Sequence, residues 1–193
     1  EDVLNALIVH HPRIQNLPDR GFQYCNTNFM LLALIVEKIT GEDFPDYMRE
    51  NIFEPLGMND TYIFSIKDTA HYNPTWSVSR PFPMDAYDCT YGDKNVYSTV
   101  HDLFIWDKSL YQHTLLKKST LDMAFTPMSN EHRSKHNYGL AWRLFITNGD
   151  TVVYHNGKWH GTNTSFIRLV QDTATIIVLE NKENRNIYKA KEM

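Results

Sequence analysis

Two polar side chains stand directly before a long apolar segment: a phenol at Tyr24 and an amide at Asn26. The segment from Met30 to Ile39 is apolar at all but two positions, which predicts a helix buried in the core. Asn26 or Thr27 can cap its N-terminus, and Gly41 can provide a left-handed C-terminal stop. The phenol and the amide would be held rigidly where the chain enters this helix, as a site requires. Taken alone, the tyrosine also fits a half-buried aromatic residue, and the asparagine fits an ordinary helix cap.

Histidines offer a second kind of chemistry, the binding of a metal ion. His155 and His160 lie close together near the end of the chain, and His10 and His11 are adjacent near its beginning. None of these four belongs to a His-x-x-x-His pair, and the two cysteines are far apart. The sequence therefore predicts no metal site and no cofactor. By itself, His155 is typical of a solvated or core imidazole.

Length and composition limit the classes of protein to consider. A chain of 193 residues with 42% hydrophobic residues can form one domain with a sizeable core. Its net charge of −4 gives no basic surface for nucleic acid or anionic lipid. The chain opens on Glu1 inside an expected helix, so we interpret it as a fragment of a longer protein.

The first two thirds of the chain predict helices around one long connection. We expect helices over Glu1–Val9, over Asp43–Phe53 with Pro45 in its first turn, from a Ser98 cap to Tyr111, and from a Ser119/Asp122 capping box to Pro127. The segment 57–97 has weak periodicity, and a connection of this length is more often functional than idle.

The last third predicts antiparallel strands. We expect them over Tyr138–Ile146, Thr151–His155, Thr164–Val170 and Thr173–Leu179, with a hairpin turn at Asn148-Gly149. Helices followed by such strands indicate an α+β layered domain.

Three stretches, in this order, carry a family resemblance. They are Tyr24-Cys25-Asn26; the pair Ile52–Met58 and Val96–Leu103; and His155-Asn156-Gly157 with the later strand Ile176–Asn181. Together they resemble the serine β-lactamase and penicillin-binding protein family, in its branch of class C β-lactamases, D-alanyl-D-alanine carboxypeptidases and esterases. The first stretch matches the Tyr-x-Asn motif of that family, and the third matches its Lys-Thr-Gly or His-x-Gly strand motif. The resemblance covers almost the whole chain.

The resemblance implies a fold with a recognisable part absent. Residues 1–193 would form a partial β-lactamase/transpeptidase-like domain, with a mainly helical lobe at 1–134, antiparallel strands at 135–181 and the start of a C-terminal helix at 182–193. The first strands, the nucleophile helix and the rest of the terminal helix would be missing. We therefore expect an exposed strand edge and self-association into a homo-oligomer through it.

The resemblance also implies acyl transfer through a serine of a Ser-x-x-Lys motif. Tyr24 would exchange protons with the nucleophile and the leaving group, assisted by nearby cations. Asn26 would hydrogen-bond the amide of the substrate and the lysine of the motif. His155 would line the opposite wall, near the phenol and any substrate carboxylate.

Three positions on the strand motif would contact the substrate. Asn156 and Gly157 would bind it, with the glycine letting the backbone come close, and the main-chain N–H of Lys158 would be an oxyanion donor. Relatives that bind a carboxylate usually have Thr or Ser where this sequence has Asn156. D-alanyl-peptide specificity is therefore in doubt, which leaves small esters and D-amino-acid amides as candidate substrates.

The absence of one motif of the family leaves two functions open. No Ser-x-x-Lys occurs in the sequence. We interpret the chain as the C-terminal part of a serine hydrolase that cleaves an amide or ester, and expect the 193 residues alone not to hydrolyse nitrocefin or p-nitrophenyl acetate. The alternative is a non-catalytic relative that keeps the walls of the pocket as a binding module. By analogy, the parent would be periplasmic, membrane-anchored or secreted.

Overall fold

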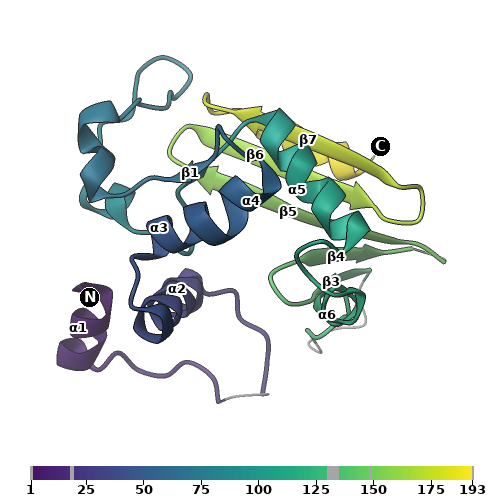
Figure 1. Cartoon of the computed structure of the whole chain (residues 1–193), viewed down its shortest axis with the longest axis horizontal. Helices are drawn as coiled ribbons and strands as arrows, with labels where there is room; N and C mark the ends of the chain where they lie inside the picture. The colour runs from purple at the N-terminus through teal and green to yellow at the C-terminus, as the bar shows by residue number, and fades with distance from the viewer. Residues whose placement is uncertain (1, 18–19, 130–134, 148, 193) are drawn as a thin grey trace.

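A mixed arrangement of helices and an antiparallel sheet confirms the predicted α+β class (Figure 1). The computed structural model describes residues 2–17, 20–129, 135–147 and 149–192. Its main sheet has the strand order β3-β4-β5-β6-β7, with every neighbouring pair antiparallel. The strands are β3 (His136–Tyr138), β4 (Arg143–Ile146), β5 (Thr151–Trp159), β6 (Thr162–Leu169) and β7 (Ala174–Glu180).

The helices lie beside and in front of this sheet (Figure 1). In chain order they are α1 (Asp2–His10), α2 (Asn26–Thr40), α3 (Phe44–Met48), the π-helical turn η1 (Arg49–Phe53), α4 (Glu54–Leu56), α5 (Val100–Gln112) and α6 (Lys118–Ala124). The long connection contains a two-stranded ribbon of β1 (Tyr62–Ile63) and β2 (Val96–Tyr97), and the 3-10 helices η2 (Ile66–His71) and η3 (Ala86–Cys89). No helix among the described residues is long and apolar enough to cross a membrane.

The predicted strand Tyr138–Ile146 is wrong, because a turn divides it into β3 and β4. The turn requires a glycine at position 139, since a Cβ there would lie 2.0 Å from the backbone oxygen of Ala124. Its N–H donates to the carbonyl of Trp142, which closes the turn. The expected hairpin at residues 148–149 falls partly outside the described residues, because residue 148 is not described.

Strand β5 is longer than the prediction, which ended it at His155. Its backbone pairs with β6 from Val152 through to Trp159, although residues 155–158 are polar or glycine. The apolar alternation that marks a strand stops before the hydrogen-bonded ladder does. The motif His155-Asn156-Gly157 therefore lies within a strand, where its backbone is rigid.

Helix α2 is not the interior helix that its composition predicted. Of its fifteen residues only Ala33 is buried, whereas Leu32, Ile35 and Ile39 are more than half exposed. The described chain covers only one side of it, where the turn at Gly92 fits against Ala33 with a backbone φ of +98°. The hydrophobic pattern thus identified the helix correctly but not its surroundings.

A single carboxylate joins α2 to the rest of the helical lobe. Glu37 Oε1 accepts hydrogen bonds from the backbone N–H of Phe44 at 3.0 Å and from the hydroxyl of Tyr91 at 2.8 Å. Burial and this carboxylate raise the pKa of Tyr91, so its hydroxyl stays a donor. The polar residue that interrupts the apolar surface of α2 is therefore an anchor.

Three helices have N-cap residues that differ from those predicted. Cys25 occupies the N-cap position of α2, and Asn26 is its first helical residue. The N-cap of α5 is Thr99 rather than Ser98, with its hydroxyl accepting from a backbone N–H one turn later. In α6 the predicted Ser119 box is absent, because the helix already begins at Lys118 after the N-cap Lys117.

A buried ion pair connects α5 to the sheet. The helix crosses in front of β6 and β7 (Figure 1). Asp107 accepts from Arg168 Nε at 2.5 Å and from the hydroxyl of Thr175 at 2.6 Å. The two charged side chains are 3% exposed or less. The guanidinium of Arg168 also lies 4.4 Å from the ring centroid of Tyr111. These contacts hold α5 against the sheet that contains β5.

The C-terminal segment forms the 3-10 helix η4 (Arg185–Glu192), which contacts β6. The hydroxyl of Tyr188 lies 2.9 Å from the carbonyl oxygen of Gly157 and 2.8 Å from Oδ1 of Asn163, which is fully buried. This segment therefore supports the strand motif from behind.

Candidate active site

The structure brings Tyr24 and His155 together, although 131 residues separate them in the sequence. Their ring centroids lie 6.2 Å apart, with an angle of 31° between the planes. Tyr24 stands just before α2 and is 45% exposed, whereas His155 is partly buried on β5. We expected His155 to line the wall opposite the phenol, and the structure places the two rings next to each other.

The imidazole of His155 is held by hydrogen bonds at both nitrogens. Nδ1 lies 2.9 Å from the carbonyl oxygen of Asn156, and Nε2 lies 2.9 Å from the hydroxyl of Tyr138. Because a carbonyl only accepts, Nδ1 carries the proton and Nε2 accepts from the phenol. Burial, with help from the nearby Arg143 charge, lowers the pKa of His155. The imidazole is therefore neutral at pH 7 and orients Tyr138.

This lowered pKa makes stability depend on pH. Below about pH 6.5 the histidine of the unfolded chain takes up a proton that His155 in the folded chain resists. The contribution of His155 to the free energy of unfolding is therefore full above that pH and is lost as pH falls. We expect His155→Gln, which can still accept from Tyr138, to flatten the decline of unfolding free energy between pH 7 and pH 5. Urea denaturation across this range measures it, with exposed His113→Gln as the control. Equal slopes in wild type and His155→Gln would contradict the assignment.

Tyr138 and Arg143 complete the surroundings of Tyr24. The guanidinium carbon of Arg143 lies 5.6 Å from the ring centroid of Tyr24 and 5.7 Å from that of Tyr138. Burial and the proximity of Tyr24 raise the pKa of Tyr138 to about 12, against the effect of Arg143. Tyr138 is thus a proton-bearing donor at neutral pH, and Arg143 is a cation beside Tyr24.

Sequence reasoning missed both of these residues. Tyr138 and Arg143 are cross-strand partners in β3 and β4, and Arg143 in turn pairs with Tyr154 next to His155. Their alignment depends on the turn that divides the predicted strand, so a continuous strand hid it. Phe22 adds a second contact, with its ring centroid 4.9 Å from that of Tyr138. It anchors the segment that carries Tyr24.

The other predicted residues occupy different places around this centre. Asn26 is exposed in the first turn of α2. Oδ1 of Asn156 accepts from the hydroxyl of its cross-strand partner Ser165 at 2.8 Å, which fixes the asparagine side chain. The side chain of Lys158 is exposed and extends toward Glu183, with Nζ 3.5 Å from the carboxylate. Only the backbone of Lys158 is therefore available as an oxyanion donor.

The strand motif has a free backbone edge within the described part of the chain. β5 pairs with β4 only as far as Tyr154, whereas β6 pairs with it up to Trp159. The edge of residues 155–159 that faces away from β6 has no strand beside it. Such an edge can receive the extended backbone of a peptide-like molecule. The absence of a Cβ at Gly157 is also needed internally, because that atom would lie 2.4 Å from Oγ1 of Thr164.

A cavity of about 730 Å³ lies beside the strand motif. Because successive side chains of a strand point to opposite faces, Gly157 and Trp159 lie on the same face of β5 as His155. The cavity is lined on this face by Trp159, Thr162 and Thr164, and from the helical lobe by the β2 ribbon around Tyr97. Tyr24, Asn26 and His155 lie outside its lining. The candidate active site is thus a partly open surface that adjoins a larger hollow.

Comparisons with known proteins identify the family of this chain. The beta-lactamase family model matches residues 2–191, so the chain belongs to the beta-lactamase family. Among similar proteins, penicillin-binding protein 4* of Bacillus subtilis (strain 168) is 31% identical over 89% of this chain and 42% of its own length. A D-aminopeptidase of Brucella ovis is 23% identical over 86% of this chain and 33% of its own length.

The fold has relatives among solved structures as well. The penicillin-binding protein of Bacillus halodurans superimposes with a TM-score of 0.80 at 20% identity, over 98% of this chain and 62% of that one. The chain spans less than half the length of the two curated relatives described above. The family includes hydrolases, as the name of the D-aminopeptidase states.

Proposed function

We propose that this chain supplies two walls of the active site of a serine hydrolase that cleaves an amide or ester through an acyl-enzyme. The nucleophile would come from a Ser-x-x-Lys motif outside residues 1–193. The serine oxygen attacks the carbonyl carbon, its proton passes by way of Tyr24 to the leaving amine or alcohol, and water then releases the acid. The backbone N–H of Lys158 stabilises the oxyanion.

The observation that carries this proposal is the meeting of Tyr24, Tyr138, Arg143 and His155. General acid-base catalysis by a phenol at neutral pH needs a cation nearby, because an ordinary phenol titrates near pH 10. Arg143 supplies a cation 5.6 Å from the ring centroid of Tyr24. Both nitrogens of His155 are engaged in hydrogen bonds, so His155 holds Tyr138 in place beside Tyr24.

We infer that the substrate is a D-amino-acid amide or a short peptide with such a residue. The D-aminopeptidase among the relatives supports this class. The free edge of residues 155–159 supports it too, since an extended acyl group with an amide can pair along that edge.

The test uses the complete protein to which this chain belongs. We expect it to release p-nitroaniline from D-alanine p-nitroanilide at least ten times faster than from the L-isomer. Intact-mass measurement during turnover should show an adduct with the mass of the acyl group. Turnover without preference for the D-isomer would contradict the substrate class, and the absence of both turnover and adduct would contradict the hydrolase.

A second candidate function is a binding module without catalysis. It is favoured by one observation, that no Ser-x-x-Lys occurs in the chain. Such a protein would keep the pocket walls and bind the D-amino-acid amide reversibly. It would show saturable binding by calorimetry, unchanged ligand after incubation and no acyl adduct, an outcome that separates it from the hydrolase.

A further inference from the structure

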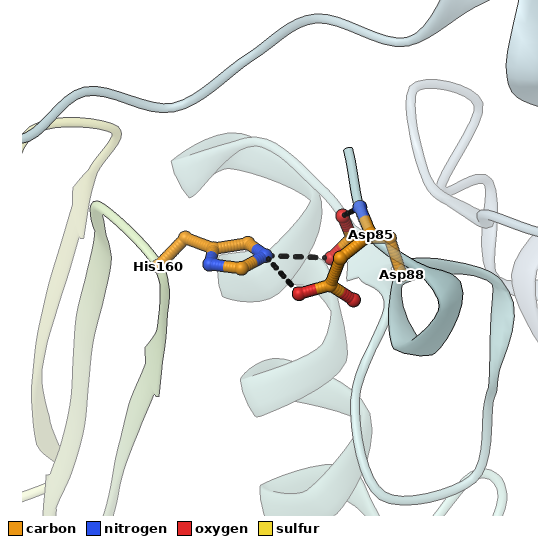
Figure 2. Close-up of side chains that lie close together, drawn as sticks. All are labelled: Asp85, Asp88 and His160. Carbon is orange, nitrogen blue, oxygen red and sulfur yellow. Dashed lines mark hydrogen bonds and ion pairs between the residues drawn. The ribbon is translucent and has the colours of Figure 1, made fainter. Parts of the chain in front are cut away.

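A cluster of one histidine and two aspartates joins the sheet to the long connection, beside the cavity that adjoins the candidate active site. His160 stands at the turn between β5 and β6, with a φ of +48°. Asp85 is the N-cap residue of the 3-10 helix η3, and Asp88 lies within that helix (Figure 2). His160 directly follows β5 and lies five residues beyond His155 in the sequence. The cluster shares none of the residues Tyr24, Asn26 and His155, but it is joined through Trp159 to the wall of the neighbouring cavity.

The three side chains converge on one point (Figure 2). Nε2 of His160 lies 3.3 Å from Oδ2 of Asp85 and 3.0 Å from Oδ1 of Asp88. One ligand atom from each residue falls within 4.8 Å of the other two. Around a tetrahedral Zn²⁺ with bonds of about 2.1 Å, ligand atoms are roughly 3.4 Å apart. The two distances from His160 are thus close to those of a tetrahedral site, and the two carboxylates offer oxygens within 4.8 Å of each other.

The charges in the cluster favour a cation. The side chain of Asp88 is only 4% exposed, yet no lysine or arginine among the described residues forms an ion pair with it or with Asp85. Lys94, whose ammonium group lies over the ring of Trp159, pairs with Asp93 at 3.0 Å. A buried carboxylate requires compensation by a positive charge or by hydrogen bonds. Hydrogen bonds with the backbone of Asp85, with Trp159 and with His160 already compensate Asp88, and a divalent ion at this point would add a positive charge.

The neighbours already orient the three groups, as the outer shell of a metal site does. Oδ2 of Asp88 accepts from the backbone N–H of Asp85 at 2.7 Å, and Oδ1 accepts from the indole N–H of Trp159 at 2.5 Å. An oxygen with two lone pairs can keep the indole and exchange the imidazole for a metal ion. The imidazole is stacked against Phe82, with ring centroids 5.2 Å apart.

From this geometry we propose that Asp85, Asp88 and His160 form a zinc site that clamps the long connection to the β5–β6 turn. The two carboxylates and one imidazole match the ligand types that Zn²⁺ accepts. The side chain of Asp85 is 44% exposed, which leaves an entry path and room for water as a fourth ligand. Sequence reasoning found no such site, because His160 and Asp88 lie 72 residues apart.

The test is calorimetric titration of the purified protein with ZnCl₂, together with thermal unfolding. We expect one Zn²⁺ per chain to bind at this site and, at about a hundred times its Kd, to raise Tm by roughly 5–10 °C. Asp85→Asn and His160→Gln should each weaken binding at least tenfold. Asp85→Asn leaves the buried Asp88 untouched, so it remains informative even if His160→Gln fails to fold.

Matched controls separate this site from incidental binding to other histidines. His113→Gln and Asp122→Asn change an exposed imidazole and an exposed carboxylate elsewhere, and both should bind zinc as wild type does. MgCl₂ should not replace zinc, because a nitrogen ligand does not suit Mg²⁺. The proposal is overturned if zinc gives no saturable binding, or if Asp85→Asn and His160→Gln bind it as tightly as the controls. The cluster would then be a hydrogen-bonded clamp alone.

Discussion

Replacing Tyr24 with phenylalanine in the complete protein should lower kcat/KM by about 10²- to 10⁴-fold. This range is what a positioned acid-base group contributes to a reaction. Phenylalanine keeps the ring that contacts Arg143, Tyr138 and His155, so the substitution removes only the hydroxyl. Steady-state kinetics on the D-amino-acid substrate measure the effect, which should lie mainly in kcat.

The matched control for this substitution is Tyr87→Phe. Tyr87 is 67% exposed on η3, and its side chain should have no part in the reaction. Its kinetics should stay within twofold of wild type. If Tyr24→Phe retained more than a tenth of the wild-type kcat/KM while folding normally, another group would have to move the proton.

Replacing Asp107 with alanine should lower the free energy of unfolding by about 3–5 kcal/mol, the cost of removing one partner of a buried ion pair. The change leaves the guanidinium of Arg168 buried without its carboxylate and the hydroxyl of Thr175 without its acceptor. Since α5 would lose its main polar connection to β6 and β7, loss of cooperative folding is the extreme form of this result. Urea denaturation followed by circular dichroism measures the loss.

An exposed ion pair provides the contrast. Asp122 pairs with Lys118 at 2.7 Å on α6, but both side chains are at least 60% exposed. Asp122→Ala should therefore cost about 0.5 kcal/mol or less. The double substitution Asp107→Leu with Arg168→Met should recover much of the lost stability, because well-packed apolar residues can replace a buried pair. A cost for Asp107→Ala no greater than that for Asp122→Ala would show that the buried pair contributes little.

The sequence predicted those parts of the fold that depend on local pattern. The α+β class, the meander from β4 to β7 and the position of α2 follow from apolar periodicity and turn residues. The turn after Tyr138 was missed because it is imposed by a tertiary contact of Gly139 with Ala124. The exposure of α2 was missed because composition reports what a helix can bury and not what covers it.

The candidate site likewise contains residues that local motifs predicted and residues that they did not. Tyr24 and His155 were identified because they belong to recognisable motifs, and the structure places their rings together. Tyr138 and Arg143 belong to no such motif and enter through strand register, which the sequence alone did not fix. The Asp107–Arg168 pair and the Asp85–Asp88–His160 cluster join segments more than 60 residues apart, so no local spacing could indicate them. The self-association expected through the free sheet edge stays a prediction.

The most direct measurement is a crystal structure of the complete protein trapped as its acyl-enzyme with a slowly hydrolysed D-amino-acid ester. We expect the acyl carbonyl carbon between the two walls, with its oxygen about 3 Å from the backbone nitrogen of Lys158 and the Tyr24 hydroxyl within hydrogen-bond reach of the acylated serine. An acyl group attached elsewhere, with Tyr24 and Lys158 both out of reach of the reacting atoms, would contradict the proposed site.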